Sequence, residues 1–307
     1  MAYLHSDREQ FRDAIDLAYE QTGVMVQAIE KDYYVTMLLR LLAQKMPYIV
    51  FKGGTSLSKC HKVIRRFSED IDITIDTLLS QGQKKKIKQA IVDSAQELGM
   101  TIENLDETRS RRDYNRYVIA YDSVIPMASD ALKAAVLLET SYTAVSFPTV
   151  LLPVHSYIGD MMEQEAPDAI EEHNINPFEM KVQGIDRTLA DKVFAVCDYY
   201  LQGKVAKHSR HLYDIYKLLP LVPQNENFRE LVKEVRAVRA QSVVCPSALP
   251  EADVPELLEK IIREKAYKQD YDSLTTQLLE ENVPYDTVIA ALKQIADGAM
   301  FDNTYGG

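Results

Sequence analysis

Hydrophobic residues recur along this chain with two different periods, and the change between them divides the chain into two parts. Up to about residue 183, runs with the two-residue alternation of a β-strand are interspersed with segments of helical period. From Ile185 onward almost every apolar run has helical spacing. Strands mixed with helices, followed by helices alone, are typical of an α+β fold. We therefore predict a mixed β-sheet with flanking helices over residues 1–183 and a helical C-terminal domain over residues 184–307.

The same periods predict the individual elements. An early helix is expected after Ser6, which with Glu9 resembles a capping box. A helix over residues 82–98 is expected to end at Gly99, a residue type typical of a helix C-terminus. Other helices are predicted at about 26–45, 185–202, 208–219, 226–242, 254–267, 271–280 and 285–298. Strands are predicted at about 48–51, 71–76, 117–121, 134–140, 149–152 and 178–182.

Composition narrows the class of protein. The chain has 307 residues with 46% hydrophobic and 26% charged residues, as expected of a soluble globular protein. No apolar run approaches the roughly 20 residues that span a bilayer, and the first residues do not resemble a signal peptide. Three scattered cysteines form no paired framework, which favours a reducing, cytoplasmic setting without a membrane partner. The net charge of −11 argues against a protein that coats nucleic acid non-specifically.

The most informative stretch is FKGGTSLSKCHKVIRRFSEDIDITID, residues 51–76. Gly53 and Gly54 would let the backbone approach a ligand closely. Thr55 and Ser56 then fall at the first turn of a helix, where free N–H groups favour an anion, and Lys59 adds a positive charge about one turn later. The spacing is not that of a Walker A loop. We therefore predict a phosphate cradle formed by these five residues.

Carboxylates follow on a strand of period 2. Residues two apart share a face, so Asp70, Asp72, Thr74 and Asp76 face one side, opposite three isoleucines. Neighbouring carboxylates repel unless a cation lies between them, and a divalent metal ion is the usual one. Glu139, which ends the apolar run KAAVLLET, is the candidate for a third ligand. The sequence thus predicts a metal site at Asp70, Asp72 and Glu139.

Basic residues are concentrated locally despite the acidic total. The arginines at 109, 111, 112 and 116 are accompanied by Tyr114 and Tyr117, which suits a contact to RNA phosphates and bases. A solvated loop explains the same residues, as solvated helix faces explain Lys84, Lys85, Lys86 and Lys88. Arg65 and Arg66, just before the aspartates, have two interpretations as well, namely charge balance and a direct substrate contact.

These motifs together resemble the nucleotidyltransferase superfold related to DNA polymerase β. More narrowly, FKGGTSLSK and FSEDIDI are similar to the AbiEii/AbiGii-type toxin family of nucleotidyltransferases. MKVQGIDRTLADKVFAVCDYY and RHLYDIYKLL resemble the later motifs of that family. By that resemblance Lys192 and Asp214 take the positions of the catalytic lysine and aspartate. His211 stands where the family commonly has an acid.

The resemblance implies a magnesium-dependent transfer of a nucleotide from an NTP to an acceptor hydroxyl. Two Mg²⁺ ions would be held by Asp70, Asp72 and Glu139. It also implies a toxin that modifies tRNA, opposed by a cognate antitoxin. Alternatives are a nucleotidyltransferase acting on a small molecule such as an antibiotic or on a protein, and a non-catalytic nucleotide-binding module.

Overall fold

The computed structural model describes residues 3–66, 68, 70–75, 79–126, 134–142 and 147–302. Asp76 and Glu69, both part of the acidic stretch, lie outside the described residues. The chain forms two compact units, which we describe separately. The first comprises residues 1–60 and 68–182, and the second comprises residues 61–67 and 183–307. The division into independent domains at 183/184 stays a prediction, and here the short segment 61–67 belongs with the helical unit.

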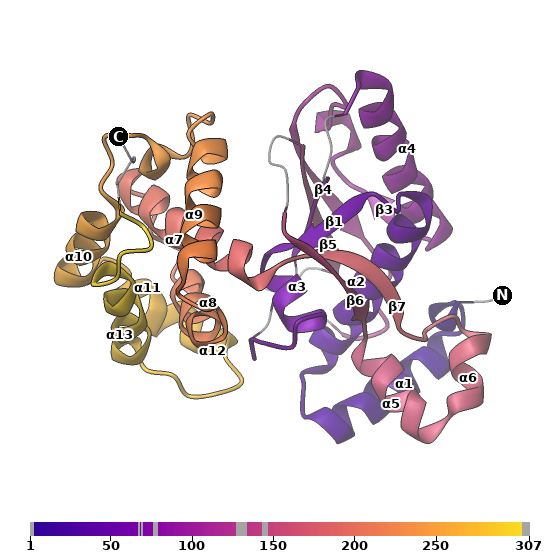
Figure 1. The fold of residues 1–307 in the computed structure, drawn as a ribbon. Helices are drawn as coiled ribbons and strands as arrows, with labels where there is room; N and C mark the ends of the chain where they lie inside the picture. The colour runs from indigo at the N-terminus through magenta and orange to yellow at the C-terminus, as the bar shows by residue number, and fades with distance from the viewer. Residues whose placement is uncertain are drawn as a thin grey trace. The chain divides into compact units, whose positions relative to one another are not determined.

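The predicted mixed sheet is confirmed in the first unit. Among the described residues seven strands form one sheet in the order β3-β4-β5-β2-β1-β7-β6. Figure 1 shows strands of this sheet together with helices of the same unit, such as α4 (Gln81–Glu97). In this sheet β2 lies antiparallel to β1 and parallel to β5, while β4 is antiparallel to β5. The strands are β1 (Ile49–Lys52), β2 (Asp70–Ile75), β3 (Thr101–Ile102), β4 (Tyr114–Ala120), β5 (Ala135–Ser141), β6 (Thr149–Val154) and β7 (Phe178–Gln183).

The helices of the first unit start where their capping residues dictate. α1 is capped by the side chain of Asp7, which accepts from the N–H groups of Glu9 and Gln10. The expected capping box at Ser6 is therefore wrong, because α1 begins at Arg8 and Asp7 is its N-cap residue, while Ser6 ends a preceding 3-10 turn. A capping box is instead formed at the start of α4, by Ser80. The described helices of this unit are α1 (Arg8–Thr22), α2 (Val26–Lys45), α3 (Gly53–Lys59), α4 (Gln81–Glu97), α5 (Tyr157–Glu165) and α6 (Pro167–Glu172), with short 3-10 turns η1 (Leu4–Ser6) and η2 (Leu105–Glu107).

The core of the first unit lies on one face of β2. Ile71, Ile73 and Ile75 are almost fully buried and belong to the same apolar cluster as Leu38 and Leu42 of α2. The alternating strand therefore buries its isoleucine face, as predicted, and turns Asp70 and Asp72 to the other side, where both are partly exposed. The fold thus presents the two carboxylates on a rigid strand.

The second unit is helical, as predicted. Its described helices are α7 (Ile185–Leu201), α8 (Arg210–Leu218), α9 (Glu226–Arg239), α10 (Val254–Glu264), α11 (Lys268–Asp270), α12 (Thr276–Leu278) and α13 (Tyr285–Ala296). Short 3-10 turns η3 (Leu219–Leu221) and η4 (Pro246–Ala248) connect them. The helix expected over 271–280 is interrupted, because Tyr271–Thr275 (η5) is a π-helix. In the described ranges no helix is both long and apolar enough to cross a membrane.

Candidate active site

The glycine turn brings two predicted motifs into contact. β1 ends at Lys52, and Gly53 begins α3 with a left-handed φ of +80°. A Cβ at this position would lie 2.0 Å from Asp72 Oδ2, so the Asp72 carboxylate would have to move away. The backbone angle favours glycine at Gly53, and only glycine leaves the Asp72 carboxylate in its present place. The structure places Asp72 directly against the turn.

The two hydroxyl residues of the turn are buried and hold it in place. Thr55 Oγ1 donates to the backbone oxygen of Asp70 at 2.5 Å and lies 2.9 Å from Ser68 Oγ. Ser56 Oγ donates to the backbone oxygen of Gly53 at 2.8 Å. These hydroxyls tie α3 to the start of β2 and close the turn. A phosphate contact through the turn therefore falls to its backbone N–H groups, since the hydroxyls are already engaged.

A row of charged residues crosses the sheet beside the turn. Asp72 is the register partner of Lys52 on β1 and of Glu139 on β5. Glu139 in turn pairs with Arg116 on β4, whose Nε lies 3.7 Å from Glu139 Oε1. Register partners project to the same face of a sheet. Two carboxylates therefore stand at neighbouring positions with one cation at each end of the row.

The pKa of Tyr114 is affected by the negative charge of this face. Partial burial raises its pKa above the ordinary value, and the Glu139 and Asp72 carboxylates act in the same direction. The phenol therefore stays protonated and donates to Glu139. About half of Tyr114 is exposed, so part of this residue is accessible, whereas the predicted role of Tyr117 in base contact is wrong because Tyr117 is almost fully buried.

The carboxylates fit a magnesium ion that is completed by its substrate. In the described part of the chain no three His, Cys, Asp or Glu side chains gather closely enough to hold a metal ion alone. Magnesium commonly takes only one or two carboxylates, together with substrate phosphates and water. Asp70 and Asp72 share a face, and Glu139 is adjacent to Asp72 in register. The donor set therefore suits a metal ion that arrives with a triphosphate.

Lys59 is placed differently from the other residues of the predicted cradle. Its ammonium forms a buried ion pair with Asp32 of α2, whose other oxygen accepts from the backbone N–H of Tyr157 at 3.0 Å. Sequence reasoning missed Asp32, which stands in the charged triplet EKD at the start of a largely apolar helix. The role of Lys59 toward a phosphate stays a prediction, since the side chain here anchors α3 to α2.

The second unit brings together Lys192, Asp214 and Arg66. Lys192 Nζ lies 2.5 Å from Asp214 Oδ2. Arg66 donates from Nε to Oδ1 at 2.6 Å and from Nη2 to Oδ2 at 2.7 Å. All three residues are buried. The pairing of Lys192 with Asp214 across α7 and α8 joins the two residues that the resemblance singles out.

Electrostatics limits what Asp214 can do. Burial alone would raise its pKa, but Arg66 and then Lys192 lower it well below the ordinary value. A carboxylate so strongly held in its charged form is a poor proton acceptor. Asp214 therefore fits a role in orienting Lys192 better than a role in activating the acceptor hydroxyl. His211, at the position of the missing acid, has a pKa lowered by burial and then by Lys192, so it stays neutral.

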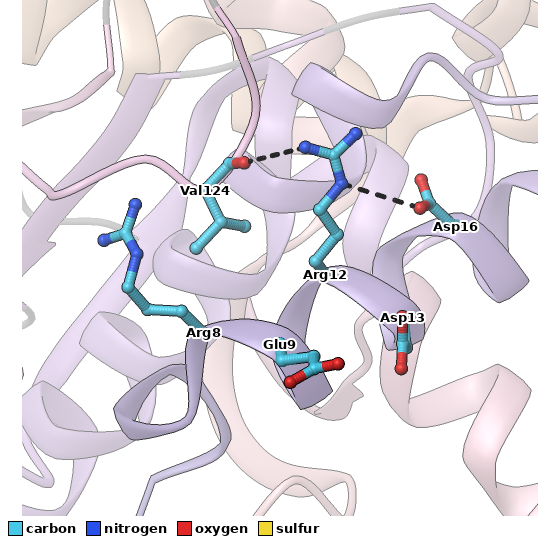
Figure 2. Close-up of a pocket in the computed structure, with 6 residues that line it drawn as sticks. All are labelled: Arg8, Glu9, Arg12, Asp13, Asp16 and Val124. Atoms are coloured by element: carbon cyan, nitrogen blue, oxygen red, sulfur yellow. Dashed lines mark hydrogen bonds and ion pairs between the residues drawn. The ribbon is translucent and has the colours of Figure 1, made fainter.

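A separate hollow in the first unit is not part of this arrangement. This space has a volume of about 370 Å³, and Figure 2 shows the residues of α1 and of the loop after β4 that line it. Arg12 donates to the backbone oxygen of Val124 at 3.2 Å and pairs with Asp16 at 3.7 Å. The guanidinium of Arg12 thus links α1 to the loop that contains Val124. The lining residues are Arg8, Glu9, Arg12, Asp13, Asp16 and Val124, none of them predicted for the site.

The sheet, the glycine turn and the strand-borne carboxylates define the nucleotidyltransferase class. The family model for the AbiEii nucleotidyl transferase toxin of type IV toxin–antitoxin systems matches residues 36–293, most of the chain. The chain therefore belongs to the AbiEii family and is a nucleotidyltransferase. This membership confirms the resemblance and excludes the non-catalytic alternative.

Comparison with solved structures gives a distant match in fold. MenT4, a nucleotidyltransferase toxin from Mycobacterium tuberculosis, superposes with a TM-score of 0.50 at 15% sequence identity. The match covers 92% of this chain and 87% of MenT4. At this identity the likeness shows the shared fold alone. A comparison with curated protein sequences finds no match to this chain.

Proposed function

We propose that this toxin transfers a nucleotide from an NTP to a hydroxyl of tRNA, with magnesium bound at Asp70, Asp72 and Glu139. The contact between Gly53 and the Asp72 carboxylate carries this proposal, because it joins the turn to the carboxylate strand. Magnesium supplies charge stabilisation on the phosphates when it is bound. The cognate antitoxin and the cytoplasmic location remain predictions from the family and the composition.

The residues of the first unit have distinct roles in this proposal. The backbone of Gly53 and Gly54 lies against the terminal phosphates, while Thr55 and Ser56 hold the turn in shape. Lys52 and Arg116 flank the carboxylates and reduce their mutual repulsion. Lys192 keeps the catalytic role that the family resemblance gives it, in which a positive charge stabilises charge that develops on the phosphates.

An exposed arginine segment supports RNA as the acceptor. Residues 109–116 carry four exposed arginines and the half-exposed Tyr114. Lys84 pairs with Asp113, and Lys88 Nζ donates to the backbone oxygen of Thr108 at 2.9 Å, so α4 holds the segment in place. Arg116 borders the carboxylate row through Glu139. Positive charge and an accessible aromatic ring beside the reaction centre suit an RNA end.

Incubation with each labelled NTP, Mg²⁺ and total tRNA tests the proposal. We expect label from one preferred NTP to appear in tRNA, and Asp72→Asn to abolish it. A matched incubation with a small hydroxylated antibiotic in place of tRNA tests the small-molecule alternative, and label in the protein band tests transfer to a protein. Label that enters either of those acceptors but never tRNA would refute the proposed acceptor.

A further inference from the structure

A short segment between the two motifs of the first unit is fixed within the second unit. His61 Nε2 lies 2.9 Å from the backbone oxygen of Gln183. The backbone N–H of Arg65 donates to Tyr213 Oη at 3.0 Å, and the N–H of Glu280 donates to the backbone oxygen of Arg65 at 3.1 Å. Contacts at several points of the backbone leave the next residue, Arg66, little freedom.

From this fixed backbone, Arg66 forms a bidentate ion pair with one carboxylate. Its guanidinium takes Oδ1 and Oδ2 of Asp214 at 2.6 and 2.7 Å, and both side chains are almost completely buried. A guanidinium fork matches the planar geometry of a carboxylate and fixes its plane. The orientation of Asp214 is therefore set from the side of Arg66.

Lys192 receives its position from that carboxylate. Its ammonium shares Oδ2 with Arg66 at 2.5 Å, and its side chain is 8% exposed. Two cations meet one anion in this cluster, so the carboxylate neutralises only part of the positive charge. The Lys192 side chain is flexible on its own, and here the fixed carboxylate holds its charged end.

We propose that Arg66 is a positioning residue for Lys192, acting through both oxygens of Asp214. The proposal rests on the catalytic role proposed above for Lys192. It assigns Arg66 neither of the two roles considered from the sequence, since its guanidinium faces Asp214 rather than serving as general charge balance or as a substrate contact.

A buried ion pair with only a structural role is the competing explanation, and the same unit offers a matched control. Arg239 donates to Asp198 at 2.7 Å and to Asp191 at 3.2 Å, linking α9 to α7. No contact joins Arg239 to Asp214 or Lys192 among the interactions of the described residues. Arg239→Met therefore removes a comparable ion pair without touching the Lys192 carboxylate.

The test measures the pH at which Lys192 becomes reactive toward an amine-labelling reagent, read peptide by peptide. Burial lowers the pKa of Lys192, Asp214 opposes this, and Arg66 adds to the lowering. Removing Arg66 takes away a neighbouring cation, so the labelling midpoint should move to higher pH in Arg66→Met. Arg210 and His211, the other titratable groups that face the cluster, remain unchanged in every variant. Arg239→Met should leave the midpoint where it is in the wild type.

Activity gives the second readout. We expect Arg66→Met to lower kcat by about 10- to 100-fold with little change in KM for NTP, and Arg66→Lys to lower it similarly because an ammonium cannot grip both oxygens. An unshifted labelling midpoint together with an Arg239→Met-like activity would overturn the inference. If Arg66→Met does not fold, Arg66→Lys decides the matter by the same two measurements. Full activity of Lys192→Met would instead refute the proposed role of Lys192, so the two failures are distinguishable.

Discussion

Gly53 has a neighbour that explains its identity. Its φ of +80° would strain any side chain, and Asp72 occupies the space where a Cβ would stand. Gly99 provides the matched case, because its φ is +65° and nothing lies within 4 Å of the Cβ position. A side chain at Gly99 would therefore cause backbone strain alone, whereas a side chain at Gly53 would also displace the Asp72 carboxylate.

We predict that Gly53→Ala and Gly99→Ala both lower the free energy of unfolding, by about 1–3 kcal/mol from backbone strain. Only Gly53→Ala should also lower kcat/KM strongly, since it pushes Asp72 aside. Thermal denaturation and steady-state kinetics of both variants measure the two effects. Equal kinetic losses would show that the Asp72 contact has no special role.

Sequence reasoning at this scale succeeded where the signal was local. The alternation of DIDITI predicted the buried isoleucine face of β2, because a strand has a fixed period. It did not predict the burial of Thr74 on the opposite face, whose hydroxyl donates to the backbone oxygen of Ser141 on β5. The partners of Lys59 and Arg66 could not be predicted, since Asp32 lies 27 positions from Lys59 and Asp214 lies 148 positions from Arg66. Such pairs are set by how helices pack, which no local pattern encodes.

At the scale of elements, α3 is anchored at both ends. Thr55 ties its first turn to β2, and Lys59 ties its last turn to α2 through Asp32. Breaking a buried ion pair by removing one partner leaves an uncompensated charge. Because of this ion pair, Lys59 could act on stability alone or also on the nucleotide, and removing both partners of the pair distinguishes the two roles.

We predict that Lys59→Met destabilises the protein by about 3–5 kcal/mol. The double variant Asp32→Leu/Lys59→Met should recover most of this loss, because no buried charge is left without its partner. Urea denaturation measures the stabilities. An active double variant would assign Lys59 to structure alone, whereas a stable but inactive one would support its predicted contact with a phosphate.

Element boundaries followed the sequence where caps and periods agreed. α2 begins and ends where predicted, and α4 ends before Gly99 with its left-handed backbone. β3, with two residues, and α6, with six, were missed because so few positions cannot establish a period; α5, with nine residues, was missed as well. The π-helix Tyr271–Thr275 was missed because its apolar spacing resembles that of an α-helix.

At the scale of the whole molecule, charge is unevenly distributed. The chain carries −11 in total, yet the arginine segment 109–116 is locally positive and contains a single acid, Asp113, that is paired with Lys84. An acidic protein with one basic segment binds a polyanion at that segment rather than over its surface. We therefore expect only a short stretch of RNA to contact the protein, at this segment.

We predict that Arg111→Glu/Arg112→Glu weakens tRNA binding at least about 10-fold and flattens its salt dependence, because each lost phosphate contact removes about 0.7 from the slope of a single strand. The KM for NTP should stay unchanged. Lys260→Glu/Arg263→Glu, at two exposed basic residues of α10, is the control with the same change in net charge. Equal losses in both variants would point to net charge alone and contradict a specific contact.

The central claim is that the carboxylates beside the glycine turn hold the metal ion for nucleotidyl transfer. Mg²⁺-dependent incorporation of labelled NTP by Asp72→Asn tests it most directly, with Asp93→Asn, at an exposed aspartate of α4 in the same unit, as the matched control. We predict a loss of at least about 1,000-fold for Asp72→Asn, with unchanged thermal stability of the fold, and near wild-type activity for Asp93→Asn. Normal incorporation by a folded Asp72→Asn protein would contradict the claim.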